Sequence, residues 1–539
     1  MRHNTIRMLA ALAALCIPLL AKAMPANPKP FTYTQPDGRQ FTLILIGDEH
    51  AHEYITTDSL LVDIDDEGFV HIGQPVNATT LRQKLKQARA HSRKYQTDKP
   101  HSSTLTPPRG LLILVNFANL SFKTEADEFD LMMNQPGYGG DGIKVGSARD
   151  YFEAQSMGQY IPTFDVIGPV TVSQPYSYYG RNLDNENKDD QHPEEMIYDA
   201  VKEAVEQGLV EDLTTYDHDH DGIVDMVYVI YAGKGENNGG STDTVWPHMW
   251  DFRETNLIDA TLQELHFGLY ACSAELDRNG SVCGIGTFCH EFGHCLGLPD
   301  LYDVDYSGGF GLGDFDIMSS GGYLGKGWCP PAYSAFERHS LGWIELEELT
   351  IDGSYQLEDL KNGNKAYRIT AHDNENEYFI LENRQQFWWD RNLPAHGMMI
   401  THIDYEQTAW DENTVNDNPD HPRVTIIPAD GKLNSLSTAN DLYPSSLGND
   451  AFTDDSSPAA VTWDGTPLQR PVTNIQETAD LITFQFKNNL TGISHQTAAD
   501  TPAPTPYYNI LGQYVLPDGK GNSHHLIINN GKKTIRQKK

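Results

Sequence analysis

The chain has 539 residues, which is too long for one hydrophobic core and predicts roughly two to four domains. Its formal net charge of −36 excludes a nucleic-acid partner, because a phosphate backbone repels such a surface. A hydrophobic content of 39% is sufficient for globular packing, and the acidity fits an exported protein.

The N-terminus has the features of a secretory signal peptide. Arg2 and Arg7 supply positive charge, residues 8–20 form a short apolar run, and residues 21–23 read Ala-Lys-Ala, an A-x-A cleavage pattern. The run is shorter than a bilayer-spanning helix, which disfavours the alternative of a membrane anchor. No later apolar segment approaches spanning length. We therefore expect a signal peptide over residues 1–23 and a mature protein that is secreted or reaches the cell surface.

The next part of the chain predicts β-hairpins. Residues 24–104 begin with two stretches of alternating apolar positions that contain the turn signals PDG and DDEG. A polar, basic segment over 82–103 follows and is suited to proteolytic cleavage. We expect residues 24–104 to form a β-rich propeptide with its activation site in the basic segment.

A mixture of strands and helices is predicted between residues 105 and 345. Continuous apolar runs at 110–117 and 224–233 indicate buried strands, and residues 193–209 have helical spacing after an initial proline. This pattern predicts an α+β fold in which a domain over 105–345 contains a mixed sheet.

The C-terminal third reads as all-β. Short strand-like runs between Gly, Asn, Asp and Pro turns predict a β-sandwich or jelly-roll domain over 346–488. Residues 489–539 start as a Pro-containing linker and end as a small β-module with a basic cluster. This tail resembles C-terminal segments of exported Bacteroidetes proteins, which implies a role in sorting with the export machinery as a partner.

The sequence HEFGHCLGLPD has the spacing of a catalytic metal site. His290 and His294 are four residues apart on a predicted helix, so both imidazoles leave one face and can bind one zinc ion. Glu291 lies beside the first ligand, and its carboxylate can reach a metal-bound water rather than the metal. Zinc lowers the pKa of this water toward ~7, and Glu291 takes the proton as the water attacks a carbonyl.

A third ligand has to come from beyond the helix. Gly297 favours the left-handed turn that ends a helix, and Pro299 prevents the helix from resuming. Asp300 then stands where a returning chain presents a carboxylate to the same ion, at the ~2.0–2.2 Å that zinc accepts. We predict His290, His294 and Asp300 as zinc ligands, with water in the fourth place. The alternative is an ordinary helix with two surface histidines.

A second metal sequence, DHDHDGIVD, occurs at residues 217–225. It repeats the first nine positions of an EF-hand loop but lacks the final bidentate glutamate, and a strand follows it instead of a helix. His218 and His220 alternate with the carboxylates and are expected to point outward. The alternative is a solvated acidic turn. We predict a structural calcium site with ligands from Asp217, Asp219, Asp221, the Ile223 carbonyl and Asp225.

Further motifs surround the predicted zinc site in a recognisable order. The stretch GGFGLGDFDIMSSGG carries Met318 and resembles the methionine turn of metzincins, in which a methionine lies beneath the metal. Together with DYFEAQSMGQYIPTFDVIGPV, TVWPHMW, PPAYSAFERHSLGW, EYFILENRQ and HGMMITHIDY, it makes the chain resemble the immune inhibitor A family of secreted bacterial metallopeptidases. The resemblance extends from about residue 25 to residue 487.

This resemblance implies a zinc-dependent endopeptidase acting on protein or peptide substrates. The domain over 105–345 would be a metzincin-like catalytic domain, with the histidines on its active-site helix, a propeptide before it and a β-rich domain behind it. Asp300 matches the position at which many metzincins have a third histidine. Tyr323 either donates to a developing oxyanion or packs in the core, and His248 is equally open.

Five cysteines remain after the leader is removed. The export setting permits disulfides, and the odd number leaves at least one thiol free or paired outside the chain. Cys289 and Cys295 flank the histidine motif, but no C-x-x-C spacing supports zinc thiolates, so a structural role or a disulfide is favoured. The five are Cys272, Cys283, Cys289, Cys295 and Cys329.

Latency through a propeptide thiolate on the metal is excluded, because no cysteine occurs between residues 24 and 271. Asp48, His50 and His52 could instead supply the propeptide ligand to the metal. The simpler interpretation is that they are polar residues at the end of a strand.

Two other functions are compatible with parts of the sequence. The first is a surface binding or adhesion protein with a vestigial metal site, favoured by the large β-region and the tail. Against it, the whole zinc motif is intact, whereas decay is expected to remove Glu291 early. The second is a non-peptide amidase, which shares the chemistry and differs only in its pocket.

Overall fold

The computed structural model describes residues 23–489 apart from 66, most of 77–108, 140–141, 185–186, 305–307, 364, 373 and 435–436. It also describes short strands at Pro18–Leu19 (β1), Tyr95–Gln96 (β7), Tyr507–Tyr508 (β21), Tyr514–Val515 (β22), His525–Asn529 (β23) and Lys532–Arg536 (β24). The chain divides into two compact units, residues 1–489 and 490–539. The predicted leader, activation segment and tail otherwise lie outside the described residues.

The first part of the larger unit is an antiparallel sheet whose strands are ordered as in the sequence. Each of the two predicted hairpins contributes paired strands, and Gly47 at the end of β3 pairs with His52 at the start of β4. The strands are β2 (Phe31–Thr34), β3 (Gln40–Gly47), β4 (His52–Thr56), β5 (Leu60–Ile64) and β6 (Val70–Pro75).

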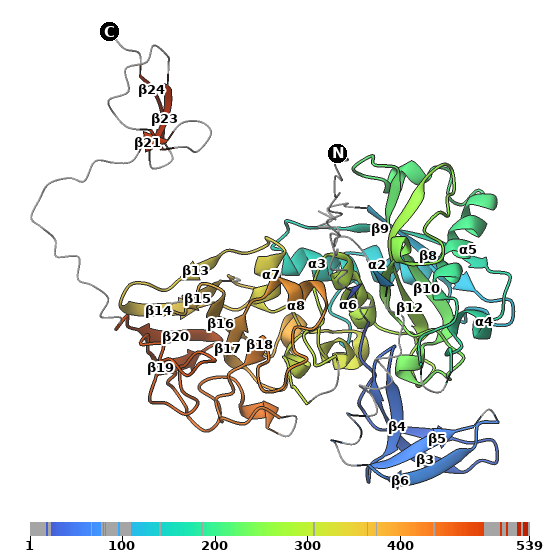
Figure 1. Cartoon of the computed structure of the whole chain (residues 1–539), viewed down its shortest axis with the longest axis horizontal. Coiled ribbons are helices and arrows are strands. Elements are labelled where there is room, and N and C mark those ends of the chain that lie inside the picture. Colours follow the sequence, from blue (N-terminus) through green and yellow to red (C-terminus); the bar gives the residue numbers. More distant parts are fainter. Residues whose placement is uncertain are drawn as a thin grey trace, which may run out of the picture. The chain divides into compact units, whose positions relative to one another are not determined.

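A second sheet forms the centre of the unit, in the order β11-β12-β10-β8-β9 (Figure 1). All neighbours are parallel except the short edge strand β11, which is antiparallel to β12. The apolar runs predicted as buried strands are confirmed as β8 and β10. The strands are β8 (Arg109–Asn116), β9 (Thr163–Thr171), β10 (Ile223–Lys234), β11 (Met249–Asp251) and β12 (His266–Leu276).

Helices cover both faces of this sheet, which explains why β8 is apolar at consecutive positions. Leu111 and Ile113 share a core with one face of α5, whereas Leu112 and Leu114 share a core with α2, α3 and α6. Figure 1 shows α5 on one side of these strands and the other three helices on the opposite side. The helices are α2 (Ala126–Asn134), α3 (Ala148–Gln155), α4 (Tyr176–Gly180), α5 (Pro193–Glu206), α6 (Ile285–Cys295) and α7 (Ala335–Ser340).

The remainder of the unit consists mainly of two sheets that share a hydrophobic core. One has the order β13-β15-β16-β17-β18 and the other β14-β20-β19. Phe379 and Ile400 of the first sheet lie in the same core as Ile482 and Phe484 of the second. The elements are β13 (Leu346–Glu348), β14 (Gly353–Leu357), β15 (Ala366–Thr370), β16 (Glu377–Arg384), β17 (Gly397–Asp404), α8 (Gln407–Asp411), β18 (Val424–Ile426), β19 (Val472–Thr478) and β20 (Leu481–Phe486).

Short 3₁₀ turns connect several of these elements, at Leu213–Tyr216, Glu236–Asn238, Phe252–Glu254, Gly313–Phe315, Gly321–Gly327, Trp388–Asp390 and Thr438–Asn440. The protein is thus a mixed α/β fold with several sheets, as the sequence predicts. No helix in the described part of the chain has the length and apolar character needed to cross a bilayer.

Candidate metal centre

The helix α6 carries the histidine motif and is buried along nearly its whole length. Phe288 and Phe292 pack in the core beneath the sheet, so the opposite face, with His290 and His294, is fixed in direction. Gly297 has φ +99°, a left-handed conformation that a residue with Cβ rarely adopts, and it ends the helix as predicted. The chain then turns back and carries Asp300 to the histidines.

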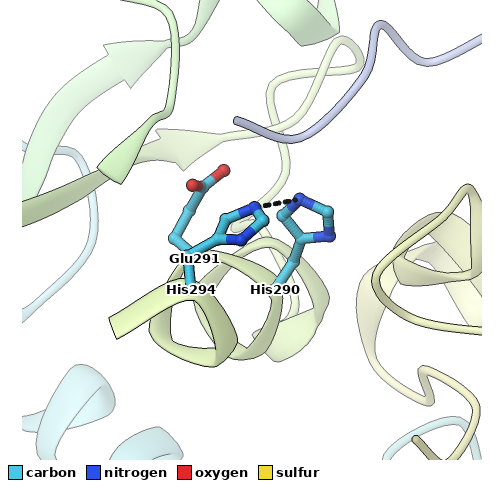
Figure 2. A group of neighbouring side chains, drawn as sticks. All are labelled: His290, Glu291 and His294. Atoms are coloured by element: carbon cyan, nitrogen blue, oxygen red, sulfur yellow. Dashed lines mark hydrogen bonds between the residues drawn. The ribbon is translucent and has the colours of Figure 1, made fainter. Parts of the chain in front are cut away.

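Both histidines are oriented by backbone carbonyls. The Nδ1–H of His290 donates to Ile317 O at 2.7 Å, and that of His294 donates to Leu298 O at 2.8 Å. Because Nδ1 carries the proton in each neutral ring, each Nε2 carries a free lone pair. The two Nε2 atoms lie 3.2 Å apart and point toward a common position above the helix (Figure 2).

Asp300 completes a triangle of ligand atoms. Its Oδ1 is 3.3 Å from His290 Nε2 and 3.2 Å from His294 Nε2. Three ligands at zinc bond lengths of ~2.0–2.1 Å and tetrahedral angles are separated from each other by about 3.3 Å. The three observed separations therefore fit one face of a zinc tetrahedron.

The electrostatics of the two imidazoles and the Asp300 carboxylate also favour a bound cation. His290, His294 and Asp300 are buried, and Asp300 Oδ1 accepts no hydrogen bond from a described residue. Burial lowers the pKa of His290, but the Asp300 and Glu291 carboxylates outweigh it and raise that pKa to about 9. Burial likewise opposes ionisation of Asp300, yet the two imidazoles hold its pKa well below the usual range. The group thus favours positive charge at its centre, which a proton on His290 or a bound cation supplies.

Glu291 lies on the same side of the helix as the histidines (Figure 2). Burial raises the pKa of its carboxyl well above the ordinary value. Its Oε1 accepts a hydrogen bond of 2.9 Å from the backbone N–H of Met24, and Oε2 has no partner among the described residues. A buried carboxylate with a raised pKa is suited to accept and return a proton.

Asn413 holds Asp300 in place and was not found by the sequence analysis. Its Nδ2 donates to Asp300 Oδ2 and its Oδ1 accepts from the Asp300 N–H, both at 2.7 Å. This leaves Oδ1 of Asp300 free to face the histidines. Asn413 follows α8 and has φ +52°, a conformation that asparagine tolerates better than most residues. The tolerance of asparagine for this conformation is the only sequence signal at Asn413, because Asn413 lies more than a hundred positions from Asp300.

Met318 lies directly against helix α6. A Cβ atom added at Gly293 would come within 2.7 Å of Met318 Sδ, so glycine at this position permits the contact. Met318 is fully buried, and its carbonyl accepts a hydrogen bond of 2.7 Å from the Leu301 N–H. The preceding carbonyl is the one that orients His290. This turn therefore fixes both the first histidine and the segment after the helix.

The start of the described chain occupies the space over this group; Figure 2 shows chain in the colour of the N-terminus passing there. Tyr302 Oη donates to Ala23 O at 2.9 Å, Trp246 Nε1 to Met24 O at 3.0 Å and Tyr323 Oη to Pro25 O at 2.6 Å. Ala23 and Met24 are completely buried. Access to Glu291 is therefore blocked by residues 23–25.

Tyr323 is thus placed to donate to a backbone carbonyl, and it also accepts a hydrogen bond of 3.0 Å from Asn237 Nδ2. His248 has a different environment. Its Nδ1 donates to Trp246 O at 2.7 Å, and burial lowers its pKa to about 4, so it is a neutral structural residue.

The three propeptide candidates for metal ligands are not brought to the histidine pair. His50 contacts Asp189 at 2.6 Å and His52 contacts Glu236 at 2.9 Å. Asp48 accepts hydrogen bonds from the backbone of the His50 turn. These side chains serve the contact between the N-terminal sheet and the central sheet.

The acidic loop brings together the carboxylates of Asp217, Asp219 and Asp221. Burial first and the neighbouring carboxylates second raise the pKa of Asp221. Asp225 does not join this group, because its Oδ2 accepts hydrogen bonds from the backbone and the imidazole of His218. His218 and His220 are both exposed, as expected, and His218 additionally bonds Asp225 at the surface.

The five cysteines are all unpaired by disulfides. Cys289 and Cys295 lie in the core beneath the sheet, and burial raises the pKa of the Cys289 thiol well above its usual value. The sequence favoured either a structural role or a disulfide for Cys289 and Cys295. In the structure both side chains pack in the core, and neither forms a disulfide.

A mixed sheet above a helix with two histidines and an adjacent glutamate is the arrangement of a metallopeptidase domain. Residues 118–344 match the family described as immune inhibitor A peptidase M6, catalytic domain. The family resemblance recognised in the sequence is thereby confirmed.

Curated relatives agree with this assignment. The chain is 30% identical over 257 residues to "Immune inhibitor A" of Bacillus thuringiensis subsp. alesti, covering 43% of this chain and 36% of the relative. It is 29% identical over 256 residues to "Pre-pro-metalloprotease PrtV" of Vibrio cholerae serotype O1, covering 41% of this chain and 27% of the relative. The matched region therefore spans about a third of the length of these relatives or less.

Proposed function

We propose that the protein is a secreted or cell-surface zinc endopeptidase with a metzincin-like catalytic domain, in which His290, His294 and Asp300 bind the zinc ion. The single observation that carries this proposal is the triangle of three lone-pair atoms, with sides of 3.2–3.3 Å. Such a triangle fits tetrahedral zinc and leaves a fourth position open, as catalytic zinc sites require.

A bound zinc ion supplies Lewis acidity and lowers the pKa of water toward ~7. Glu291 accepts the proton of the attacking water, and its raised pKa suits it to return that proton to the leaving amine. Tyr323 donates to the carbonyl oxygen of the substrate, in the way it now donates to Pro25 O.

We propose further that residues 24–104 are a propeptide that keeps the enzyme latent. The support is the occupation of the site by Met24 and Pro25, which has to end before a substrate carbonyl reaches Glu291. Removal of the leader after Ala23 would make the Met24 nitrogen, which contacts Glu291, the α-amine of the exported chain. Cleavage within the basic segment 82–103 would then permit release of the propeptide.

The other parts receive supporting roles in this proposal. The β-sandwich over 346–488 supplies Asn413, which orients a zinc ligand, so it completes the catalytic domain over 105–345. Calcium bound by Asp217, Asp219 and Asp221 would stabilise the entry to β10. The tail over 489–539 would serve export.

The substitution Glu291→Gln tests the proposal. We expect the purified variant to retain zinc and to lose casein hydrolysis by about 10²–10⁴-fold relative to matured wild-type protein, because the proton acceptor is removed. Undiminished hydrolysis would show that Glu291 is not the base. Zinc bound by both proteins, without hydrolysis by either, would instead favour the vestigial site of a surface binding protein.

A further inference from the structure

Four carboxylates of the central domain are buried beneath the N-terminal sheet, and two of them lie near Trp246: Asp190 accepts from its backbone N–H, and Glu236 bonds the histidine that stacks on its ring. They belong to Asp189, Asp190, Glu194 and Glu236, and we call them the acidic recess. All four are buried while the N-terminal sheet covers them. Asp189, Asp190 and Glu194 line a small cavity of about 60 Å³, which Glu49 and His50 of the N-terminal sheet help to close.

The recess binds a cationic side chain of the N-terminal sheet. The Nε2–H of His52 donates to Glu236 Oε1 at 2.9 Å, and its Nδ1–H donates to Asp48 O at 3.0 Å. A ring that donates from both nitrogens is an imidazolium. His52 also stacks on Trp246, with ring centroids 4.8 Å apart, a favourable position for a cation.

His50 occupies the other end of the recess. Its ring lies between Asp189 Oδ1, at 2.6 Å, and Glu49 Oε1 of its own sheet, at 3.2 Å. Two basic side chains of the propeptide thus stand against carboxylates of the catalytic domain.

Two carboxylate oxygens of the recess still have no partner. Asp190 Oδ1 and Glu236 Oε2 are buried and accept no hydrogen bond from a described residue. Asp190 Oδ2 accepts from the Trp246 N–H, and Glu236 Oε1 also accepts from Asn182. Lys188 is the nearby cation of the catalytic domain that acts on His52. Loss of the propeptide would remove both histidines and leave the recess with excess negative charge.

The recess lies along the path of the peptide in the cleft. Met24 N contacts the Glu291 carboxylate, and Met24 O accepts from Nε1–H of Trp246, whose ring stacks on His52. Three positions later, Asn27 N donates to Asn237 O at 3.0 Å, and Asn237 adjoins Glu236. A substrate in the place of residues 24–27 would therefore present side chains directly beside the recess.

We propose that the acidic recess is a specificity subsite that binds a lysine or arginine side chain of the substrate, close to the scissile bond. This inference rests on the proposed endopeptidase function and adds its substrate class. The departing histidines of the propeptide and the arriving basic side chain use the same carboxylates and the same face of Trp246.

A peptide library tests the subsite on matured full-length protein. Each position within four residues of the scissile bond carries either arginine or citrulline, which has nearly the same shape but no charge. We expect one position at which arginine raises kcat/KM about tenfold or more, as a hydrogen-bonded charge pair in a buried site can do. Equal kcat/KM values at every position would overturn the proposal.

Variants assign the preference to the recess. Glu236→Gln and Asp189→Asn should each reduce the arginine-to-citrulline ratio several-fold, and the double variant should bring it near one. The matched control is Glu206→Gln, a half-exposed carboxylate about 18 Å along α5 from Glu194, which should keep the ratio. An unchanged ratio in the double variant would contradict the assignment.

A binding measurement covers variants that fold poorly. On protein carrying Glu291→Gln, matured by limited proteolysis, the arginine peptide should bind about tenfold more tightly than its citrulline counterpart; equal affinities would refute the subsite. If matured wild-type protein cleaves none of the peptides, the proposed endopeptidase function is wrong and the subsite falls with it. Cleavage without charge preference refutes the subsite alone.

Discussion

Replacing Asn413 with alanine should weaken the zinc site although Asn413 does not contact the metal position. Both groups of its side-chain amide are used on Asp300, each at 2.7 Å, and the contact is buried. Without them, the Asp300 side chain loses the restraint that aims Oδ1 at His290 and His294.

The size of the effect follows from these two bonds. Loss of a residue that orients a metal ligand typically costs 10–100-fold in metal affinity, which is about 1.4–2.7 kcal/mol. The Asp300 N–H and Oδ2 are also left without partners in a buried site, at about 1–3 kcal/mol each in stability. We therefore expect both weaker zinc binding and a lower Tm.

The assay is competition for zinc between the purified protein and a chelator of known affinity. The matched control is Asn416→Ala, because Asn416 is equally buried and bonds Leu301 O and Val424 O at 2.9 Å without contacting Asp300. Both variants should lose stability, but only Asn413→Ala should lose about 10–100-fold in zinc affinity. Equal zinc affinity in Asn413→Ala and wild type would refute the positioning role.

Three further perturbations have defined outcomes. Gly293→Ala should lower Tm through about 1–3 kcal/mol of overpacking against Met318 Sδ, and a Tm equal to wild type would show that this contact is loose. Burial lowers the pKa of His52, but the Glu236 carboxylate outweighs this effect, so the pKa of His52 in the docked propeptide is raised. Docking of the propeptide is therefore strongest below the free-histidine pKa of ~6.5. It weakens as pH rises through the pKa that His52 has in the docked state. After cleavage of 82–103, propeptide release measured by gel filtration should accelerate from pH 6 to 8, and His52→Gln should abolish that dependence; an unchanged dependence would exclude His52 as its source. Calcium at a hundred times its Kd should stabilise the wild-type protein by about 2.7 kcal/mol and so raise its Tm. Asp219→Asn should reduce this rise in Tm. An equal rise in the variant would show that calcium binds elsewhere.

Local sequence signals were sufficient for the elements that build the centre. The apolar runs of β8 and β10 have to be buried on both faces, and the histidine spacing is meaningful only on a helix such as α6. Gly297 and Pro299 then limit where the chain can return, which brought Asp300 into consideration. These inferences needed only residues that are neighbours in sequence.

Contacts between distant segments could not be predicted in this way. Nothing around Asn413 indicates that it will bond Asp300, because the pairing depends on how the C-terminal sheets pack against the central domain. The same holds for Met24, whose position at Glu291 follows from the docking of the N-terminal sheet. The hydrogen bond between His218 and Asp225 depends on the exact path of the loop. The expectation that alternate residues point to opposite sides does not describe that path.

Anomalous diffraction at the zinc absorption edge, on crystals of the purified full-length protein, tests the central claim most directly. The account predicts one strong peak about 2.0–2.2 Å from His290 Nε2, His294 Nε2 and Asp300 Oδ1. The absence of a peak at this position, or a peak coordinated by the histidines without Asp300, would contradict it.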